Sequence, residues 1–158
     1  MDGQGKAGRV AVGVLFAVSL QLALPNRACA GGLRCSIGEV VIDNLKIGHT
    51  YSLQTLANLP LMITNTGEQS ATIRIQPLVP EAGELKQGAE AIPALSWAAA
   101  RPDSLAIAAH ESKSVELMLT IPDDERLFGR KFQVSFWSHT MAQAGDLLAY
   151  GLKSRVIF

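Results

Sequence analysis

Apolar and polar side chains alternate along several segments of this chain, and this pattern limits its fold more than any other feature. Every second residue is apolar over residues 115–121, 132–136 and 71–75. A period of two residues is typical of a β-strand, because successive side chains point to opposite faces of a sheet. Helical spacing of apolar residues is not sustained after the first thirty residues. The alternation therefore predicts an all-β protein.

Turn-forming residues separate the alternating segments. Residues 65–68 read Asn-Thr-Gly-Glu, which predicts a tight reversal in which Gly67 is free to take a positive φ. Residues 110–112 and 122–124 also predict turns. Further strands are predicted at residues 39–42, 51–53 and 148–158. Seven to eight strands with this spacing predict an immunoglobulin-like antiparallel β-sandwich.

One stretch, residues 78–100, does not alternate in this way. It contains Pro80, Pro93 and several glutamates against a single lysine. We expect a long acidic loop with a short strand near Trp97. Loops of this length are commonly functional or mobile, and an irregular crossover between the sheets is the alternative.

The first thirty residues have a different character from the rest. Basic residues precede an apolar run over residues 10–24, a proline ends that run, and Ala28-Cys29-Ala30 offers a cleavage site after Ala30. These are the parts of a secretory signal peptide. The apolar run is shorter than the roughly 20 residues of a membrane-spanning helix, and an uncleaved anchor is the alternative. The predicted organisation is a signal peptide of residues 1–30 and one domain of residues 31–158.

Cleavage would remove one of the two cysteines. Cys29 belongs to the predicted signal peptide, so Cys35 would be alone in the mature domain and no internal disulfide could form. Three states are open for Cys35: a buried thiol, a free thiol, or a disulfide with a second chain that would make a dimer.

Charge and composition argue against several classes of function. The chain has 14 basic and 14 acidic residues, so we do not expect nucleic-acid binding. His49, His110 and His139 lie far apart, and none has a neighbour at metal-ligand spacing. No serine has the flanking glycines of a hydrolase nucleophile, and no phosphate-binding glycine loop is present. We expect no metal, no cofactor and no catalytic residue.

Aromatic and histidine residues are the candidates for a binding surface. The apolar residues of 132–136 occupy one face of their predicted strand, which places Trp137 on the other face. A tryptophan there either binds a ligand or packs under a loop, and Trp97 is the candidate partner for that packing. His139 follows at the end of the same strand. The candidate binding residues are Trp97, Trp137 and His139.

Three sequence steps resemble secreted bacterial immunoglobulin-like domains. They are an apolar strand followed by Asn-Thr-Gly at residues 59–67, a polar turn and long alternating strand at 105–117, and a loop and strand at 121–134. The resemblance covers residues 39–138 and extends to NEW3-like domains, major-sperm-protein-like domains and the N-terminal domain of pilus chaperones. The step Ser138-His139-Thr140 is similar to that of an uncharacterised group of exported bacterial proteins. The resemblance implies a β-sandwich and no particular activity.

These observations predict an exported, non-catalytic binding or structural module of the bacterial cell envelope, either periplasmic or extracellular. We expect another envelope protein as its partner, held through sandwich edges or loops, and no membrane insertion after signal cleavage. A carbohydrate- or cell-wall-binding module that uses exposed aromatics is the second hypothesis, and a hydrolase is the third. Pilus chaperones hold a subunit's carboxylate with a basic pair between two domains, whereas this chain has room for one domain.

Overall fold

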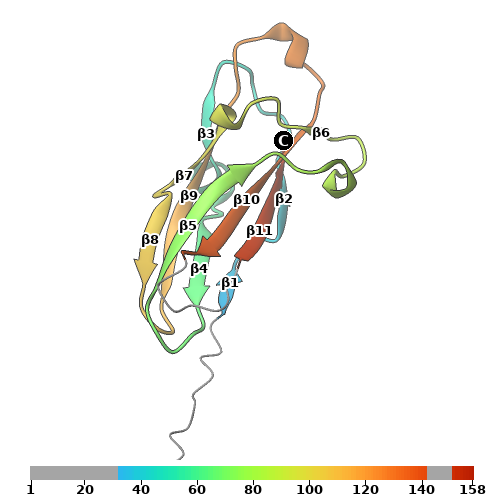
Figure 1. Cartoon of the computed structure of the whole chain (residues 1–158). Helices are drawn as coiled ribbons and strands as arrows, with labels where there is room; N and C mark the ends of the chain where they lie inside the picture. The colour runs from blue at the N-terminus through green and yellow to red at the C-terminus, as the bar shows by residue number, and fades with distance from the viewer. Residues whose placement is uncertain (1–31, 142–150) are drawn as a thin grey trace, which may run out of the picture.

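Two β-sheets packed face to face make up the computed structural model, which describes residues 32–141 and 151–158 (Figure 1). The first sheet consists of β1 (Leu33–Cys35), β4 (Leu61–Asn65), β9 (Ser112–Thr120), β3 (Thr50–Ser52) and β7 (Ala98–Arg101). The second sheet consists of β2 (Glu39–Val41), β11 (Gly151–Ile157), β10 (Phe132–Thr140), β5 (Ala71–Leu78), β8 (Ser104–Ile107) and β6 (Glu90–Ala91). The predicted immunoglobulin-like β-sandwich is confirmed. The predicted signal peptide lies outside the described residues.

Most neighbouring strands are antiparallel, as predicted, but two pairs are parallel. β2 runs parallel to β11, and the short strand β6 runs parallel to β10. In the described residues the helical segments are α1 (Leu53–Ala57) and the 3-10 turns η1 (Ala82–Glu84), η2 (Leu95–Trp97) and η3 (Glu125–Leu127). None of the helices in this part of the chain is long and apolar enough to cross a membrane.

The core lies between the two sheets and follows the alternation of the sequence. In β9, Val115, Leu117 and Leu119 are buried, while the residues between them are partly exposed. Full burial of such a side chain contributes about 1.5–3 kcal/mol. The largest fully buried apolar side chains come from both sheets and the segments between them: Phe136, Leu53, Leu61, Ile63, Ile73, Ile75, Ile92, Ile107, Leu117 and Leu119.

Strand β10 departs from the predicted alternation because both of its faces are covered. Phe132 and Phe136 face the core, as predicted, but Gln133 and Ser135 on the other face are also buried, with 0% and 2% exposure. The cover is the segment of residues 82–91, which we call the strap. It lies against the outer face of the second sheet, on the right-hand side of Figure 1.

One buried amide and two ion pairs hold the strap on the sheet. Nε2 of Gln133 donates to the carbonyl of Glu84, and Oε1 accepts from the N–H of Lys86, each at 2.9 Å. Lys153 of β11 pairs with Glu84 at 2.5 Å, and Lys86 pairs with Glu39 of β2 at 3.0 Å. The hydrogen bond from Lys153 holds the pKa of the Glu84 carboxyl below its usual range. These contacts favour an ordered crossover over a mobile loop in this stretch.

A buried side chain, rather than a glycine, builds the turn after β4. Gly67 is free to adopt a positive φ in this turn but does not do so. Instead, Oδ1 of Asn65 accepts from the N–H of Gly67 at 2.9 Å. Nδ2 of Asn65, a residue 3% exposed, donates to the carbonyls of Gln69 at 2.7 Å and of Ile107 and Ala108 at 3.2 Å. One amide therefore joins the end of β4 in the first sheet to the end of β8 in the second.

We expect Asn65→Asp to lower the free energy of unfolding by about 2–4 kcal/mol at neutral pH. The substitution removes the donor of three backbone carbonyls and buries a carboxylate beside them. Urea denaturation followed by circular dichroism measures the change. Gln87→Glu makes the same chemical change at an exposed turn residue and should cost less than about 0.5 kcal/mol. Equal losses in the two variants would contradict this role of Asn65.

Gln133→Ala should release the strap while leaving the core folded. The variant loses both hydrogen bonds of the buried amide, so we expect the Lys86 N–H to exchange about tenfold faster with solvent. Hydrogen exchange followed by NMR would measure this, with the amides of β9 as the internal reference. The control is Lys153→Ala, which removes only an exposed ion pair and should have a smaller effect. A larger effect in the control would show that the ion pair holds the strap.

Candidate functional site

β11 has a neighbouring strand along only part of its outer side. β10 pairs with it over its whole length, whereas β2 pairs only with Arg155–Ile157. The N–H of Arg155 donates to the carbonyl of Gly38 at 2.9 Å, just before β2 begins. Within the described part of the chain, no strand pairs with residues 151–154 on this side. We call these four residues the β11 edge.

The β11 edge exists because the N-terminal segment changes from one sheet to the other. β1 pairs with β4 in the first sheet, while β2 pairs with β11 in the second. Between them, Ser36 is fixed to the first sheet: its N–H donates to the carbonyl of Met62 at 3.0 Å, and its hydroxyl accepts from the N–H of Met62 at 2.9 Å. The hydroxyl of Ser154 then donates to the carbonyl of Ile37 at 2.6 Å, where the chain reaches β11. The preceding part of β11 therefore remains unpaired on this side.

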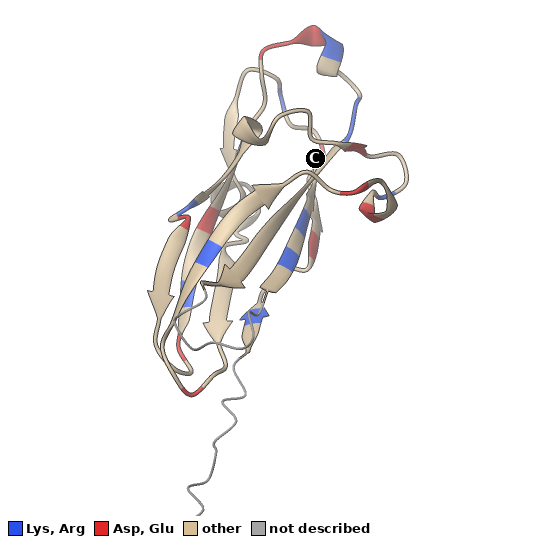
Figure 2. Cartoon of the chain, in the orientation of Figure 1, with Lys and Arg blue, Asp and Glu red and all other residues tan. Residues whose placement is uncertain are grey.

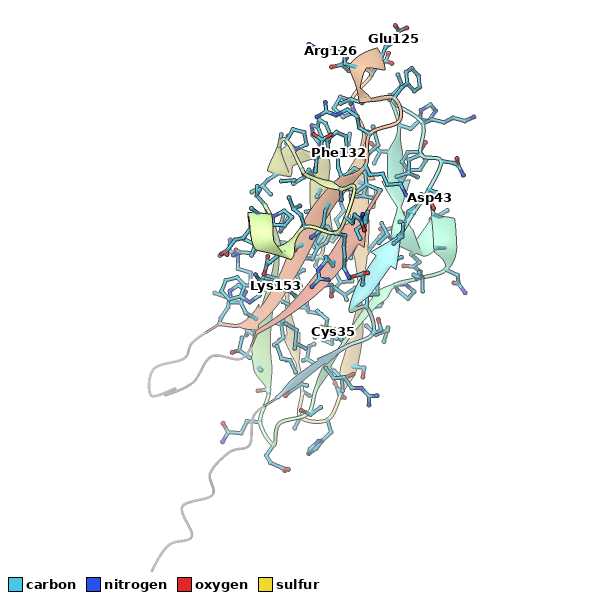
Figure 3. All side chains as sticks on the ribbon, turned by 90° about the vertical axis from the view of Figure 1, so that its right-hand side faces the viewer. Cys35, Asp43, Glu125, Arg126, Phe132 and Lys153 are labelled. Carbon is cyan, nitrogen blue, oxygen red and sulfur yellow. The ribbon has the colours of Figure 1, made fainter. Side chains whose placement is uncertain are left out.

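Half-buried apolar side chains lie on β1 and on the nearby β11 edge. Leu33 and Cys35 of β1 pack against the core but are only half-buried, and Leu152 of β11 is half-buried as well. Figure 3 shows Cys35 and Lys153 on the same side of the molecule. Burial raises the pKa of the Cys35 thiol, which lowers the fraction of reactive thiolate at neutral pH. A disulfide between Cys35 residues of two chains stays a prediction.

Trp137 and His139 form a stacked pair on the outer face beside the β11 edge. Their ring centroids are 3.9 Å apart, and the rings are inclined by 19°. The indole lies over Gly151, because a Cβ atom added to that residue would collide with Nε1 of Trp137. Residue 151 must therefore be glycine for the ring to keep this position. The structure thus brings two of the predicted binding residues together, next to an open strand.

Charged and polar side chains surround this aromatic pair. The strand register places Arg74 and Gly151 on either side of His139, and Gln76 and Lys153 on either side of Trp137. Figure 2 shows basic residues along β11 next to acidic residues of β2 and the strap. The arrangement offers three kinds of interaction to a ligand: backbone hydrogen bonds from the edge, an aromatic surface, and the ammonium group of Lys153.

Trp97 lies apart from this pair. It ends η2 and contacts Phe132 edge to face, with ring centroids 5.5 Å apart and planes at 86°. The predicted packing of Trp97 against Trp137 is therefore wrong, because Phe132 points into the core from the opposite face of β10. The outer face is covered instead by the strap. The role of Trp97 in binding stays a prediction.

The sequence pattern does not indicate the β11 edge or the roles of Gly151 and Lys153 in it. The predicted strand at 39–42 leaves out β1 and gives no reason to expect a change of sheet. Gly38 is the signal that could have indicated the change of sheet, because it lies in the break between two short segments, 33–35 and 39–41, that both form strands. His49 and His110 are exposed, as predicted. Among the described residues, no group of three His, Cys, Asp or Glu side chains could hold a metal ion.

Known protein structures share the fold of this chain, but they do not establish its activity. No protein-family model matches the sequence, and no curated protein matches it. PapD-like domain 7 of human CEP192 superposes with a TM-score of 0.57 and 10% identity, covering 95% of both chains. The periplasmic chaperone SfaE gives a TM-score of 0.50 with 10% identity, covering 80% of this chain and 56% of the chaperone.

A third similar structure is a chain from the chaperone–tip adhesin complex of CFA/I fimbriae biogenesis. Its TM-score is 0.52 with 12% identity, and the superposition covers 80% of this chain and 55% of that one. This chain therefore spans about half the length of the two chaperone-related chains. At these identities the likeness shows the fold alone, an immunoglobulin-like sandwich similar to that of PapD-like domains.

Proposed function

We propose that this protein is an exported, non-catalytic binding module of the bacterial envelope that holds an extended segment of another envelope protein by strand addition. The observation that carries this proposal is the partial pairing of β11, which β2 covers only over Arg155–Ile157. The proposal takes residues 31–158 as one mature domain, with residues 1–30 as its signal peptide. It places the protein in the periplasm or outside the cell.

The backbone geometry of β11 supports strand addition. Phe132 and Phe158 exchange both backbone hydrogen bonds, at 2.7 and 2.9 Å, so the even-numbered residues here face β10. The odd-numbered residues face away from β10, as the bond from Arg155 to Gly38 illustrates. Gly151 and Lys153 therefore direct their N–H and C=O groups away from the sheet. An extended chain can pair with such groups as an additional strand.

The surroundings of the edge support a protein partner. An added strand would cover the half-buried Leu33, Cys35 and Leu152, which an isolated domain leaves partly in contact with water. One of the similar structures is a periplasmic chaperone, and another is a chain from a chaperone–tip adhesin complex, so a chain of similar fold does take part in binding another protein. The proposal takes from these structures only the binding of another protein. It does not assign any other activity of those longer chains to this protein.

Carbohydrate binding through exposed aromatics is the competing function. The stacked Trp137 and His139 favour it, because one face of a flat aromatic pair can receive a sugar ring. The position of Trp97 against Phe132 argues against a continuous aromatic platform. Tryptophan fluorescence titrations with cell-wall polysaccharides separate the two functions. A saturable response that Trp137→Ala abolishes, without any captured protein, would favour the carbohydrate.

Lys153→Pro is expected to abolish partner binding while leaving the fold intact. Proline removes the N–H that points away from β10 and keeps the hydrogen bonds that join β11 to β10. We expect affinity for a partner captured from a periplasmic extract to fall by at least about tenfold. Pull-down of that partner, followed by titration with the purified protein, measures the change.

Lys153→Ala is the matched control for this substitution. It removes the ion pair with Glu84, as the proline variant does, but keeps the backbone N–H. A smaller loss of affinity in the alanine variant than in the proline variant supports strand addition, because the alanine variant loses only the ammonium group of Lys153. Binding retained by both would overturn the proposal, and so would equal loss in both. Thermal unfolding of each variant verifies that the domain is folded.

A further inference from the structure

Directly opposite residues on neighbouring strands project their side chains to the same face of a sheet. A segment added at the β11 edge would therefore place two residues on the outer face, one opposite Gly151 and one opposite Lys153. The residue between them, opposite Leu152, would lie on the inner side of the sandwich. The surroundings of the two outer positions differ, because one lies beside an aromatic ring and the other beside a lysine. The edge can therefore distinguish between partner segments of different sequence.

The position opposite Gly151 faces an aromatic ring. Gly151 has no side chain, and the indole of Trp137 occupies the space above it, with Nε1 as its nearest atom. The imidazole of His139 stacks on the indole at 3.9 Å and holds the ring in this orientation. A large apolar side chain of the added segment would meet the indole across Gly151.

The position opposite Lys153 favours an acid, and the chain itself contains the equivalent arrangement one step along β11. Arg155 lies directly opposite Glu39 of β2, and their side chains pair at 2.7 Å. Lys86 of the strap also reaches Glu39, at 3.0 Å, so two basic groups surround one carboxylate. Lys153 is the next basic residue of β11 on the same face, and its side chain stays 47% exposed although it already pairs with Glu84 of the strap. An acidic residue opposite Lys153 would continue this row of ion pairs.

The geometry points to an amphipathic partner segment that carries a large apolar residue opposite Gly151 and an acidic residue opposite Lys153, two positions apart. This inference rests on the proposed function, because it names the segment that the β11 edge accepts. Trp137 and Lys153 are the residues that determine specificity, and Gly151 allows the indole to reach the edge. The inner position of the segment suits a small or apolar residue over Cys35 and Leu152.

Short synthetic peptides of alternating valine and threonine provide the probe. The first peptide carries leucine and glutamate two positions apart on one face, the second replaces the leucine by threonine, and the third replaces the glutamate by glutamine. Calorimetric titration measures the affinity of each peptide for the full protein and for Gly151→Ala. The alanine methyl displaces the indole but leaves the backbone of the edge unchanged.

We expect the loss of leucine to weaken binding to the unchanged protein by about tenfold and to have little effect on Gly151→Ala. The exchange of glutamate for glutamine should weaken binding to the unchanged protein and have little effect on Lys153→Ala. If Gly151→Ala does not fold, the pair Trp137→Ala and Trp137→Phe replaces it, with phenylalanine expected to keep part of the leucine preference. If each peptide change lowers the affinity for the variant protein as much as for the unchanged protein, the inference is overturned.

Lys153→Pro separates this inference from the proposed function. If the three peptides bind with equal affinity and Lys153→Pro abolishes binding of all of them, strand addition stands and the amphipathic preference is overturned. If Lys153→Pro binds them as the unchanged protein does, strand addition at this edge fails, and the preference fails with it.

Discussion

The burial of β10 on both faces is the constraint on which the second sheet depends. Phe132 and Phe136 fix its inner face in the core, while the amide of Gln133 fixes its outer face under the strap. With both faces fixed, β10 sets the register of β11 beside it. A slip of one residue in that register would turn every side chain of β11 to the opposite face and would place Leu152, rather than Gly151, under the indole.

The core could be predicted because it follows from local alternation. In β9 the apolar residues predicted to be buried are buried, since a period of two residues assigns faces without knowledge of the partner strands. Gln133 and Asn65 could not be predicted in the same way. Gln133 is polar on a face expected to meet water, and only the distant strap explains its burial. Asn65 builds a turn where Gly67 was the obvious residue, because its amide also bonds to the carbonyls of Ile107 and Ala108.

The candidate site could be predicted only in part for a similar reason. Strand parity alone places Trp137 and His139 on the outer face of β10. The open edge beside them depends on where the N-terminal segment leaves the first sheet, and this is decided by contacts of Ser36 and Ser154 that no local pattern contains. Residue 151 must be glycine because the indole of Trp137 lies over it from the neighbouring strand β10. That contact cannot be read from the residues next to Gly151 in the sequence.

An unpaired strand is also a hazard, because two copies of one domain can join through it and continue into aggregates. Lys153 lies in the middle of the β11 edge and Arg155 follows on the same face. When two such edges meet, both copies bring Lys153 and Arg155, with their partners Glu84 and Glu39, into a setting with less water, and this loss of hydration opposes the contact. A foreign segment brings no second lysine to the edge. Lys153 thus disfavours the pairing of two copies at this edge.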